Sequence, residues 1–416
     1  MIPSSLNILL NNNNWEAAEQ FIKDMPTPLP QNILECLAWC YSRQEKYEES
    51  VKVYDELLMM EPHNAKWLYS KGYQFYAQKD YKNSVVYFEK ALEVYPDYLV
   101  VRYRIAYAYI QLSGNDNPWT KDLFWKAINH LKNAHEIYKK YDNEGKEKSK
   151  DVYADICALH GKTLVNSTKY LDLSIKYLEL SLSLKDDEDV HYQLAKAYYN
   201  KKDYAKSLEN LPQKGKPPFY VLELKSQILA DQNDIEGANN ILFRLLKFRK
   251  KDYLYRRLAT NYLIINNLGE AYKYAKQALD CNRKSYINWL TYGQICYARA
   301  FYQEALYCLS EARNKRQSDN NLDLPEATEI IDKINSMGLT DNNKEEWIIG
   351  SITHYNNTRG FGFITSQNGL EKFFFHISQF NKMPQPKIGD KVKFKQEETS
   401  KGLQATQISY LITSGV

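Results

Sequence analysis

Aromatic residues cluster near the end of this 416-residue sequence, at spacings that suit the stacking of flat rings. Residues 359–365 read Arg-Gly-Phe-Gly-Phe-Ile-Thr, and a run of three phenylalanines ends at His376. Because residues two apart in a β-strand share a face, we expect Phe361 beside Phe363, and Phe374 beside His376 on a neighbouring strand. A nucleobase stacked on one such ring gains roughly 1–3 kcal/mol, independent of its sequence. The pattern therefore predicts a surface that binds single-stranded nucleic acid.

Glycines and basic residues accompany these rings. Gly360 and Gly362 alternate with them, and we expect the bare backbone to let flat bases lie close. Four basic residues are candidates for phosphate contacts: Arg359, Lys372, Lys391 and Lys393. If three or four of them bind phosphate, the logarithm of the binding constant should fall with the logarithm of salt with a slope of roughly −2 to −3. The alternative is that these side chains are only solvated.

The elements that must position these residues are strands. From Trp347 onward, short β-rich runs alternate with Asn, Gly and Ser turns, which predicts a five-stranded antiparallel barrel. The expected strands are 347–355, 359–365, 371–376, 389–396 and 403–411. This stretch resembles the cold-shock domain, a family with the OB-fold, whose pattern has a basic residue before Gly-Phe-Gly-Phe-Ile and then an aromatic strand ending in His. The resemblance implies binding of single-stranded RNA or DNA.

The segment departs from the family pattern at several positions. His354 stands where the family usually has a stacking tryptophan, and Tyr355 where it has phenylalanine. Ile377 replaces a further aromatic residue, and Lys372 replaces a common acid. The resemblance makes His354 and Tyr355 candidates for nucleic-acid binding, with weaker stacking on their side. In the alternative reading, the phenylalanines pack against the rest of the chain and bind nothing.

Small residues recur in three columns before this segment, mostly 34 or 33 residues apart. The first column comprises Ala38, Gly72, Ala106, Gly161, Ala195, Ser226, Ala259 and Gly293. The second comprises Ser50, Ser84, Ala127, Ser174, Ser207, Ala238, Ala271 and Ala305, and the third Leu57, Ala91, Ala134, Ser181, Leu245, Ala278 and Ala312. Antiparallel helices packed about 8–10 Å apart leave no room for large side chains where they cross. The columns therefore predict stacked pairs of helices.

One unit shows the repeat most clearly, as Trp289-x-x-Tyr292-Gly293, and it resembles the tetratricopeptide repeat (TPR). The resemblance implies an α-solenoid of about eight helix pairs over residues 31–319, after a degenerate pair in residues 1–30. Residues 320–346 are expected to hold a capping helix, from Pro325 to Met337, and a linker, and residues 347–416 the barrel. An insertion at 113–121 interrupts the third repeat, and prolines within 211–218 should break the second helix of the fifth.

Solenoids of this kind mostly hold proteins or peptides on a concave face lined by the first helix of each repeat. Projecting these helices inward yields an aromatic stripe of Trp39, Tyr69, Tyr73, Tyr76, Tyr103, Tyr107, Tyr192 and Tyr199. Such a stripe could grip an extended peptide or stack bases. With 35 tyrosines in the chain, a general bias in composition is the alternative explanation. The Lys and Asn pattern that clamps a C-terminal carboxylate in some family members is not recognisable here.

Other functional classes find little support in the sequence. We recognise no phosphate-binding Gly-Lys-Ser/Thr loop, no His-Glu-x-x-His helix and no serine elbow, so neither a catalytic residue nor a cofactor is predicted. The six cysteines lack metal-ligand spacing, so no metal site is expected. No apolar run approaches the roughly 18 residues of a membrane span, and the first 24 residues lack a secretory pattern. We expect a cytoplasmic protein without membrane contact.

The net charge of +4 is small, and residues 344–416 carry most of it, with nine Lys/Arg against six Asp/Glu. We therefore expect a non-catalytic adaptor whose barrel binds single-stranded nucleic acid, and RNA rather than DNA. The helical repeats would recruit a protein or extend the nucleic-acid path. The alternative is a scaffold, or a regulatory subunit of a separate enzyme such as a nuclease, whose small β domain is a docking module.

Overall fold

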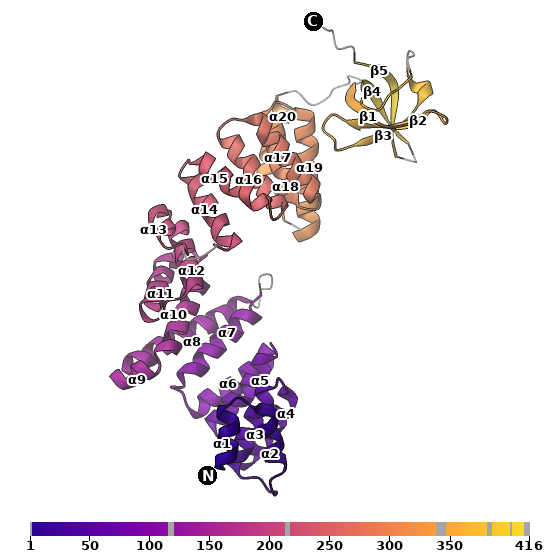
Figure 1. The fold of residues 1–416 in the computed structure, drawn as a ribbon. Coiled ribbons are helices and arrows are strands. Elements are labelled where there is room, and N and C mark those ends of the chain that lie inside the picture. The colour runs from indigo at the N-terminus through magenta and orange to yellow at the C-terminus, as the bar shows by residue number, and fades with distance from the viewer. Residues whose placement is uncertain are drawn as a thin grey trace. The chain divides into compact units, whose positions relative to one another are not determined.

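The computed structural model describes residues 2–114, 120–212, 217–320, 322–337, 347–380, 385–399 and 402–411. The chain divides into two compact units, Met1–Asp234 and Ile235–Val416. The first unit is helical, and the second combines helices with a small barrel of five strands (Figure 1). Helix pairs and a five-stranded barrel are the fold class that the sequence predicts, and this prediction is confirmed.

The first unit consists of short helices that pack as antiparallel neighbours. These are α1 (Ser4–Asn11), α2 (Trp15–Lys23), α3 (Gln31–Arg43), α4 (Tyr47–Met60), α5 (Ala65–Ala77), α6 (Tyr81–Val94), α7 (Leu99–Leu112), α8 (Thr120–Lys140), α9 (Asn143–Lys148), α10 (Lys150–Leu164), α11 (Leu171–Leu184), α12 (Glu188–Asn200), α13 (Tyr204–Glu209) and α14 (Phe219–Asp231). A 3₁₀ turn at Thr168–Tyr170 precedes α11.

The second unit continues with helices α15 (Ile235–Leu246), α16 (Asp252–Ile264), α17 (Leu268–Cys281), α18 (Tyr286–Ala298), α19 (Tyr302–Asn320) and α20 (Pro325–Ser336). Helix α20 occupies the predicted capping segment, and its Ile334 is buried in the same hydrophobic cluster as Leu309 of α19. The strands are β1 (Ile348–Asn356), β2 (Phe361–Ser366), β3 (Lys372–His376), β4 (Lys391–Thr399) and β5 (Gly402–Tyr410). Their bounds differ from the predicted ones by at most three residues.

The small-residue columns mark where paired helices touch. A Cβ atom on Gly161 would lie 2.5 Å from Leu178 Cγ, and one on Gly293 would lie 2.8 Å from Leu309 Cγ. Serines of the second column add hydrogen bonds across the pair: the Ser50 hydroxyl donates to the Ala38 carbonyl at 2.8 Å. The same bond joins other pairs, from Ser174 to Gly161 and from Ser207 to Ala195, both at 2.7 Å. The columns thus follow from close helix approach, as the sequence predicts.

The turns between paired helices share a backbone conformation that the sequence did not reveal. One residue in each of seven turns has a positive φ: Asn13, Glu45, Lys79, Lys202, Asn233, Asn266 and Ala300. None of the seven is glycine, although left-handed backbone usually favours it. In the turn after α3, the Lys46 amide donates to the Tyr41 carbonyl at 2.9 Å, which satisfies a carbonyl at the end of α3.

Two irregularities that the sequence predicts fall largely outside the described residues, and two features are new. Helix α13 has only six residues before the proline-containing segment, whose residues 213–216 lie outside the described part of the chain. The insertion in the third repeat also lies there, at 115–119. The new features are the short helix α9 and the division of the chain between α14 and α15, which splits the sixth predicted repeat.

The barrel is closed in the strand order β1-β2-β3-β5-β4. All neighbouring strands are antiparallel except β3 and β5, which pair in parallel where Phe374 faces Gln404. Alternate residues point inward and form one hydrophobic core, which comprises Ile352, Ile364, Phe373, Phe375, Val392, Phe394, Ala405 and Ile408. The residues between them in β2 and β3 consequently point outward.

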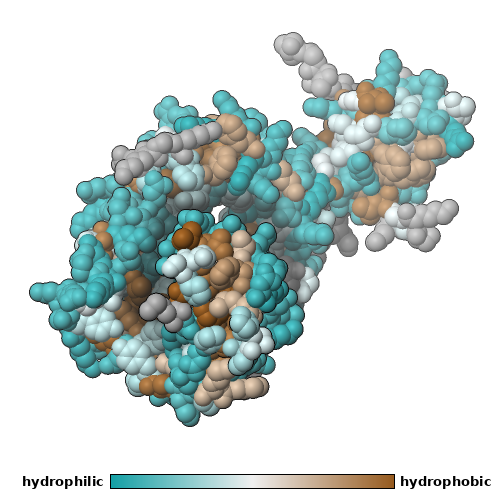
Figure 2. All heavy atoms as spheres, turned by 60° about the horizontal axis from the view of Figure 1, so that its bottom comes forward, coloured by the Kyte–Doolittle hydropathy of each residue, from teal (hydrophilic) through white to brown (hydrophobic). Residues whose placement is uncertain are grey.

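No helix in the described ranges is long and apolar enough to cross a membrane. Hydrophilic residues cover most of the face seen in Figure 2, with hydrophobic residues gathered in separate patches. Large apolar side chains that remain exposed include Trp39 in α3, and Phe363 and Phe374 in the barrel.

Candidate nucleic-acid interface

A platform of rings lies on the outer face of β1, β2 and β3. In the strand register, Phe363 pairs with Phe374, and Phe361 pairs with His376. The ring centroids of Phe363 and Phe374 are 5.9 Å apart, and those of Phe361 and Phe374 are 5.8 Å apart. We call the five residues His354, Phe361, Phe363, Phe374 and His376 the platform. The structure thus brings together the rings that the sequence places on one face.

The exposure of these rings sets them apart from the barrel core. Phe363 and Phe374 each keep 38% of their surface exposed, whereas Phe373 and Phe375, on either side of Phe374, are fully buried. The alternation of β3 therefore divides its three phenylalanines between core and surface. Exposed rings in mutual contact on a soluble domain are typical of a binding surface.

His354 reaches the platform because β1 is irregular. The register between β1 and β2 shifts between Ile352 and His354, so both Thr353 and His354 are exposed. This bulge brings the His354 ring to 6.4 Å from the Phe363 ring. Tyr355, in contrast, lies half-buried, with its ring stacked at 6.0 Å on Phe375. The structure thus separates Tyr355 from the other rings that were expected to bind nucleic acid.

The comparison with known proteins agrees with this geometry. Residues 348–411 match the family model of the 'Cold-shock' DNA-binding domain. The cold shock-like protein CspA of Vibrio cholerae serotype O1 is 36% identical over 67 residues, which cover 15% of this chain and 91% of that protein. Residues 348–411 are a cold-shock domain. Domains of this family suggest nucleic-acid binding.

The helical part also has known relatives. Residues 37–64 and 65–98 match a family model of the tetratricopeptide repeat, so the chain carries TPR repeats. A solved tetratricopeptide repeat protein from Parabacteroides merdae is 16% identical, with a TM-score of 0.39, and the match covers 62% of this chain and 96% of that one. Pseudomonas aeruginosa pilF is 16% identical, with a TM-score of 0.41, over 52% of this chain and 90% of its own. TPR domains suggest protein interaction, and both kinds of domain are typically non-catalytic.

Glycines of the cold-shock domain have roles that differ from the sequence expectation. Gly362 points inward, because a Cβ atom there would collide with the His354 carbonyl oxygen and lie 2.7 Å from the Phe375 ring. Its small size therefore serves the packing of β1 against β2, not the approach of a base. Gly360 has a φ of +66°, which a residue with a side chain adopts only with strain. It lets the chain turn into β2 next to His376 and Ile377.

The predicted basic residues take different places around the platform. Arg359 is exposed in the turn before β2, where its backbone amide donates to Asn356 Oδ1 at 3.0 Å. Lys372 is exposed at the start of β3, opposite Thr365. Lys391 lies on β4, opposite Ser351 of β1, and is two strands removed from the rings of β2 and β3. Arg359 and Lys372 therefore flank the platform directly, whereas Lys391 is more distant.

Lys393 belongs to a second aromatic contact that sequence reasoning missed. Its ammonium lies 4.9 Å from the centroid of the Trp347 ring, and that of Lys395 lies 5.6 Å from it. Trp347 is 41% exposed. The two lysines are two residues apart on one face of β4, a spacing that could have suggested this cluster. Trp347 itself precedes the cold-shock motif, so the motif gave it no role.

The aromatic stripe of the TPR repeats is only partly continuous. Tyr69, Tyr73, Tyr76, Tyr103 and Tyr107 are half-buried in the first helices α5 and α7. Sequence reasoning missed Arg104, whose guanidinium lies 5.0–5.6 Å from the rings of Tyr73, Tyr76 and Tyr103. This half-buried cation contacts all three tyrosines.

The remaining predicted stripe residues lie in other surroundings. Tyr192 packs edge-on against Tyr220 at 4.6 Å, and Tyr199 lies 6.1 Å from Tyr204. Trp39 is 44% exposed and meets Trp15 edge-on at 4.8 Å. The stripe therefore consists of separate clusters, each held by its own neighbours.

The described residues offer few groups for metal binding or for proton transfer by histidine. The described part of the chain contains no group of three His, Cys, Asp or Glu side chains that could hold a metal ion. The buried histidine His135 bonds through Nε2 to His160 Nδ1 at 2.9 Å and through Nδ1 to the Tyr153 hydroxyl at 3.1 Å. Burial lowers the pKa of His135 to about 4 and that of His160 to about 3, so both are neutral at pH 7.

Proposed function

We propose that this protein is a non-catalytic adaptor, whose cold-shock domain holds single-stranded RNA while its TPR repeats bind a protein partner. The observation that carries the proposal is the platform, with Phe363 and Phe374 in contact and each 38% exposed. Its rings occupy three neighbouring strands, so successive bases of one flexible strand can stack on them.

The strength of binding follows from the number of rings. Stacking contributes roughly 1–3 kcal/mol for each base, and the platform offers three phenylalanine rings. Part of this gain is offset by the immobilisation of a flexible strand, so we expect a dissociation constant of about 1 µM. Arg359 and Lys372 flank the rings and would contact phosphates. With these two contacts, the slope of log affinity against log salt should be roughly −1.4, at about −0.7 for each phosphate contact on a single strand.

Stacking on rings does not distinguish RNA from DNA, because it does not involve the 2′-hydroxyl. We therefore propose RNA on the basis of the cellular compartment. Four of the six cysteines lie in the first helices of repeats, and burial raises the pKa of several, including Cys40 and Cys157. Such reduced, unreactive thiols suit a reducing compartment. We therefore place the protein in the cytoplasm, where single-stranded RNA is the abundant single strand.

The charges of the first two repeats and of the cold-shock domain support different partners. Residues 344–416 carry nine Lys/Arg and six Asp/Glu, a net charge of +3. Residues 1–98, which contain the matched TPR repeats, carry nine Lys/Arg and fourteen Asp/Glu, a net charge of −5. A negative surface repels a polyanion. This contrast supports a protein partner for the first repeats and argues against their extending the nucleic-acid path.

Binding of a fluorescent single-stranded 12-mer RNA to the full chain tests the proposal. Fluorescence anisotropy should report binding with a dissociation constant of about 1 µM at low salt, with a matched DNA of similar affinity or weaker. The double variant Phe361→Ala with Phe363→Ala should abolish it. The control variant Trp39→Ala removes an exposed ring of the TPR repeats and should bind the RNA as the unmodified protein does.

If the unmodified protein binds no oligonucleotide at low salt, the proposal is wrong. The chain would then be better explained as a scaffold or as a regulatory subunit of a separate enzyme, such as a nuclease, with the cold-shock domain as a protein-docking module. Co-purification of an enzyme that is retained by the variant Phe361→Ala with Phe363→Ala would support that alternative.

A further inference from the structure

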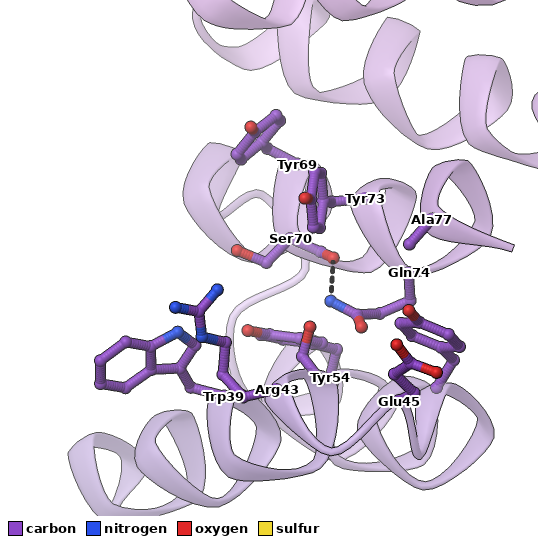
Figure 3. A pocket seen from close by; sticks show the side chains of 11 residues that line it. Trp39, Arg43, Glu45, Tyr54, Tyr69, Ser70, Tyr73, Gln74 and Ala77 are labelled. Atoms are coloured by element: carbon purple, nitrogen blue, oxygen red, sulfur yellow. Dashed lines mark hydrogen bonds between the residues drawn. The ribbon is translucent and has the colours of Figure 1, made fainter. Parts of the chain in front are cut away.

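A pocket of about 400 Å³ lies between the first two TPR repeats, lined by residues of α3, α4 and α5 and of the turn between α3 and α4. Figure 3 shows Trp39 and Arg43 on one side of it, Glu45 on the other, and the Gln74 amide pointing from α5 into the space between them. Nothing described so far assigns a ligand to this pocket. Its chemistry can be derived from three features: an unpaired acceptor, a carboxylate and aromatic faces.

The unpaired acceptor is the amide oxygen of Gln74. The Gln74 side chain is 2% exposed, and its Nε2 donates to the Ser70 carbonyl at 3.0 Å. Because that carbonyl can only accept, the amide orientation is defined, and Oε1 is the atom directed elsewhere. Oε1 has no hydrogen-bond partner among the described residues. A buried acceptor without a partner destabilises the fold, so the pocket favours a ligand that donates an N–H group.

The carboxylate belongs to Glu45, which is exposed at the rim of the pocket and forms no ion pair within the described ranges. The pocket also holds the Arg43 guanidinium, which lies 5.4 Å from the centroid of the Trp15 ring. The surrounding residues 1–98 carry a net charge of −5. Beyond the opposite charges of Glu45 and Arg43, the charge of this region therefore favours a cation.

The aromatic faces complete the environment. Trp39, which is 44% exposed, lines the pocket together with the less exposed Tyr54, Tyr69 and Tyr73. The Tyr73 ring also has the Arg104 guanidinium 5.6 Å from its centroid, so Trp39 offers the most open face. Ring faces are negative at their centre and attract cations at about 6 Å or less. A guanidinium group is planar, so it can stack on a ring while its N–H groups donate in its own plane. A lysine ammonium has no such face and is more strongly hydrated.

We infer that this pocket binds the arginine side chain of an extended, basic segment of the partner protein. The guanidinium donates to Gln74 Oε1 and faces Glu45, with the tyrosine and tryptophan rings around it. The inference rests on the proposed role of the TPR repeats as the protein-binding part of the adaptor. It specifies the chemistry of the partner: a segment that carries arginine and opposes the negative charge of the first repeats.

A nucleotide is the rival ligand, because a base could also stack here and donate to Gln74. The phosphate it brings would, however, enter a region with five more acidic than basic residues. The rival is included in the test as guanosine 5′-monophosphate.

The test measures binding of blocked amino acids to the full chain by saturation-transfer NMR. N-acetyl-L-arginine N-methylamide should bind with a dissociation constant of about 1 mM, the range expected for a ligand of this size. The corresponding citrulline compound has the same shape without the charge and should bind at least about five-fold more weakly, as should the lysine compound. Equal binding of arginine and citrulline compounds would overturn the inference.

Variants locate the binding. Gln74→Met removes the acceptor at similar volume and should weaken arginine binding by about ten-fold, because a hydrogen bond to a charged group is lost. Glu45→Gln changes only an exposed side chain and should weaken it by about three-fold. Glu48→Gln, an exposed residue of α4 outside the pocket, is the matched control with the same change in net charge. Thermal unfolding of each variant confirms that it folds.

The outcomes separate this inference from the proposed function. If all three variants bind the arginine compound equally, or if the nucleotide binds and is the ligand that Gln74→Met weakens, the pocket does not recognise arginine. The same preparations are also titrated with the labelled RNA, whose binding depends on the cold-shock domain. Normal RNA binding combined with absent arginine binding would reject only the inference, whereas absent RNA binding would reject the proposed function.

Discussion

The TPR repeats and the cold-shock domain both carry aromatic surfaces, but their rings are held in different ways. In α5 and α7 the tyrosines are half-buried and gathered around the guanidinium of Arg104. In the barrel, the rings of Phe363 and Phe374 lie 5.9 Å apart and stay exposed. The charge of the first two repeats also differs from that of the cold-shock domain, at −5 for residues 1–98 and +3 for residues 344–416.

This difference shows that aromatic content alone does not define a binding surface. A ring that packs under a cation of its own chain has already used part of its attraction, whereas an uncovered ring retains it for a ligand. The sign of the surrounding charge then selects the class of ligand.

The largest expected effect is on nucleic-acid binding. Phe363→Ala with Phe374→Ala removes two exposed rings and should weaken binding of the labelled RNA by at least about 30-fold, at roughly 1–3 kcal/mol for each stack. Tyr73→Ala with Tyr103→Ala, made in the TPR repeats, should leave RNA affinity unchanged. If both double variants lose equal affinity by anisotropy, the comparison between the two surfaces fails.

Acid should destabilise the TPR repeats through the pair His135 and His160. Burial holds their pKa values at about 4 and about 3, below the ordinary 6.5, so the unfolded chain takes up more protons as pH falls. Their stabilising contribution is present above pH 6.5 and is lost as the pH falls toward 4. Between pH 7 and pH 5 the loss should be about 2 kcal/mol for each histidine.

Thermal unfolding followed by circular dichroism at several pH values measures this loss. His160→Asn removes one titrating group, so it should reduce the drop in melting temperature between pH 7 and pH 5. It should also lower the melting temperature at pH 7, because a buried hydrogen bond to His135 is lost. His63→Asn, at an exposed position in the loop before α5, is the control and should follow the unmodified protein. A pH profile that is the same for all three proteins would assign the acid sensitivity to other groups.

A packing variant should affect the stability of the repeats without affecting the cold-shock domain. In Gly293→Val, the new side chain would overlap Leu309, which is 2.8 Å from the position of its Cβ, and should lower stability by about 1–3 kcal/mol. The melting temperature of the helical transition should fall while RNA affinity at 20 °C stays constant. The exposed Gly269, with no atom nearer than 3.9 Å to its Cβ position, offers Gly269→Ala as a control.

The smallest expected effect concerns salt. Lys372→Gln removes one charge beside the platform and should reduce the magnitude of the slope of log affinity against log salt by about 1. Lys52→Gln, an exposed residue of α4, should leave the slope unchanged. An unchanged slope for Lys372→Gln would mean that Lys372 does not contact phosphate.

Much of the fold could be predicted because it repeats. The three small-residue columns indicated helix pairs, and their members, such as Gly161 and Ser174, do lie where the helices touch. The barrel strands followed from alternation and from the match to the cold-shock pattern. The division of the chain at Asp234 was not visible, since the sixth repeat keeps its small residues on both sides of it.

The candidate site was predicted less completely. Phe361, Phe363, Phe374 and His376 follow strand alternation, so a period of two placed them on one face. His354 and Tyr355 did not follow it, because the bulge in β1 turns the first outward and leaves the second against Phe375. Gly362 was misread for a related reason: its inward position depends on the neighbouring strands, which a single strand cannot show.

The periodic features of this protein could be predicted without the structure: helix pairs from columns about 34 residues apart, strands from alternation, and the contrast in charge between its ends. These depend on the order of residue types along the chain. The rings that remain uncovered, the tyrosines around Arg104 and the unpaired oxygen of Gln74 emerged only from the fold. Such features depend on contacts between side chains far apart in the sequence, and no local period encodes them.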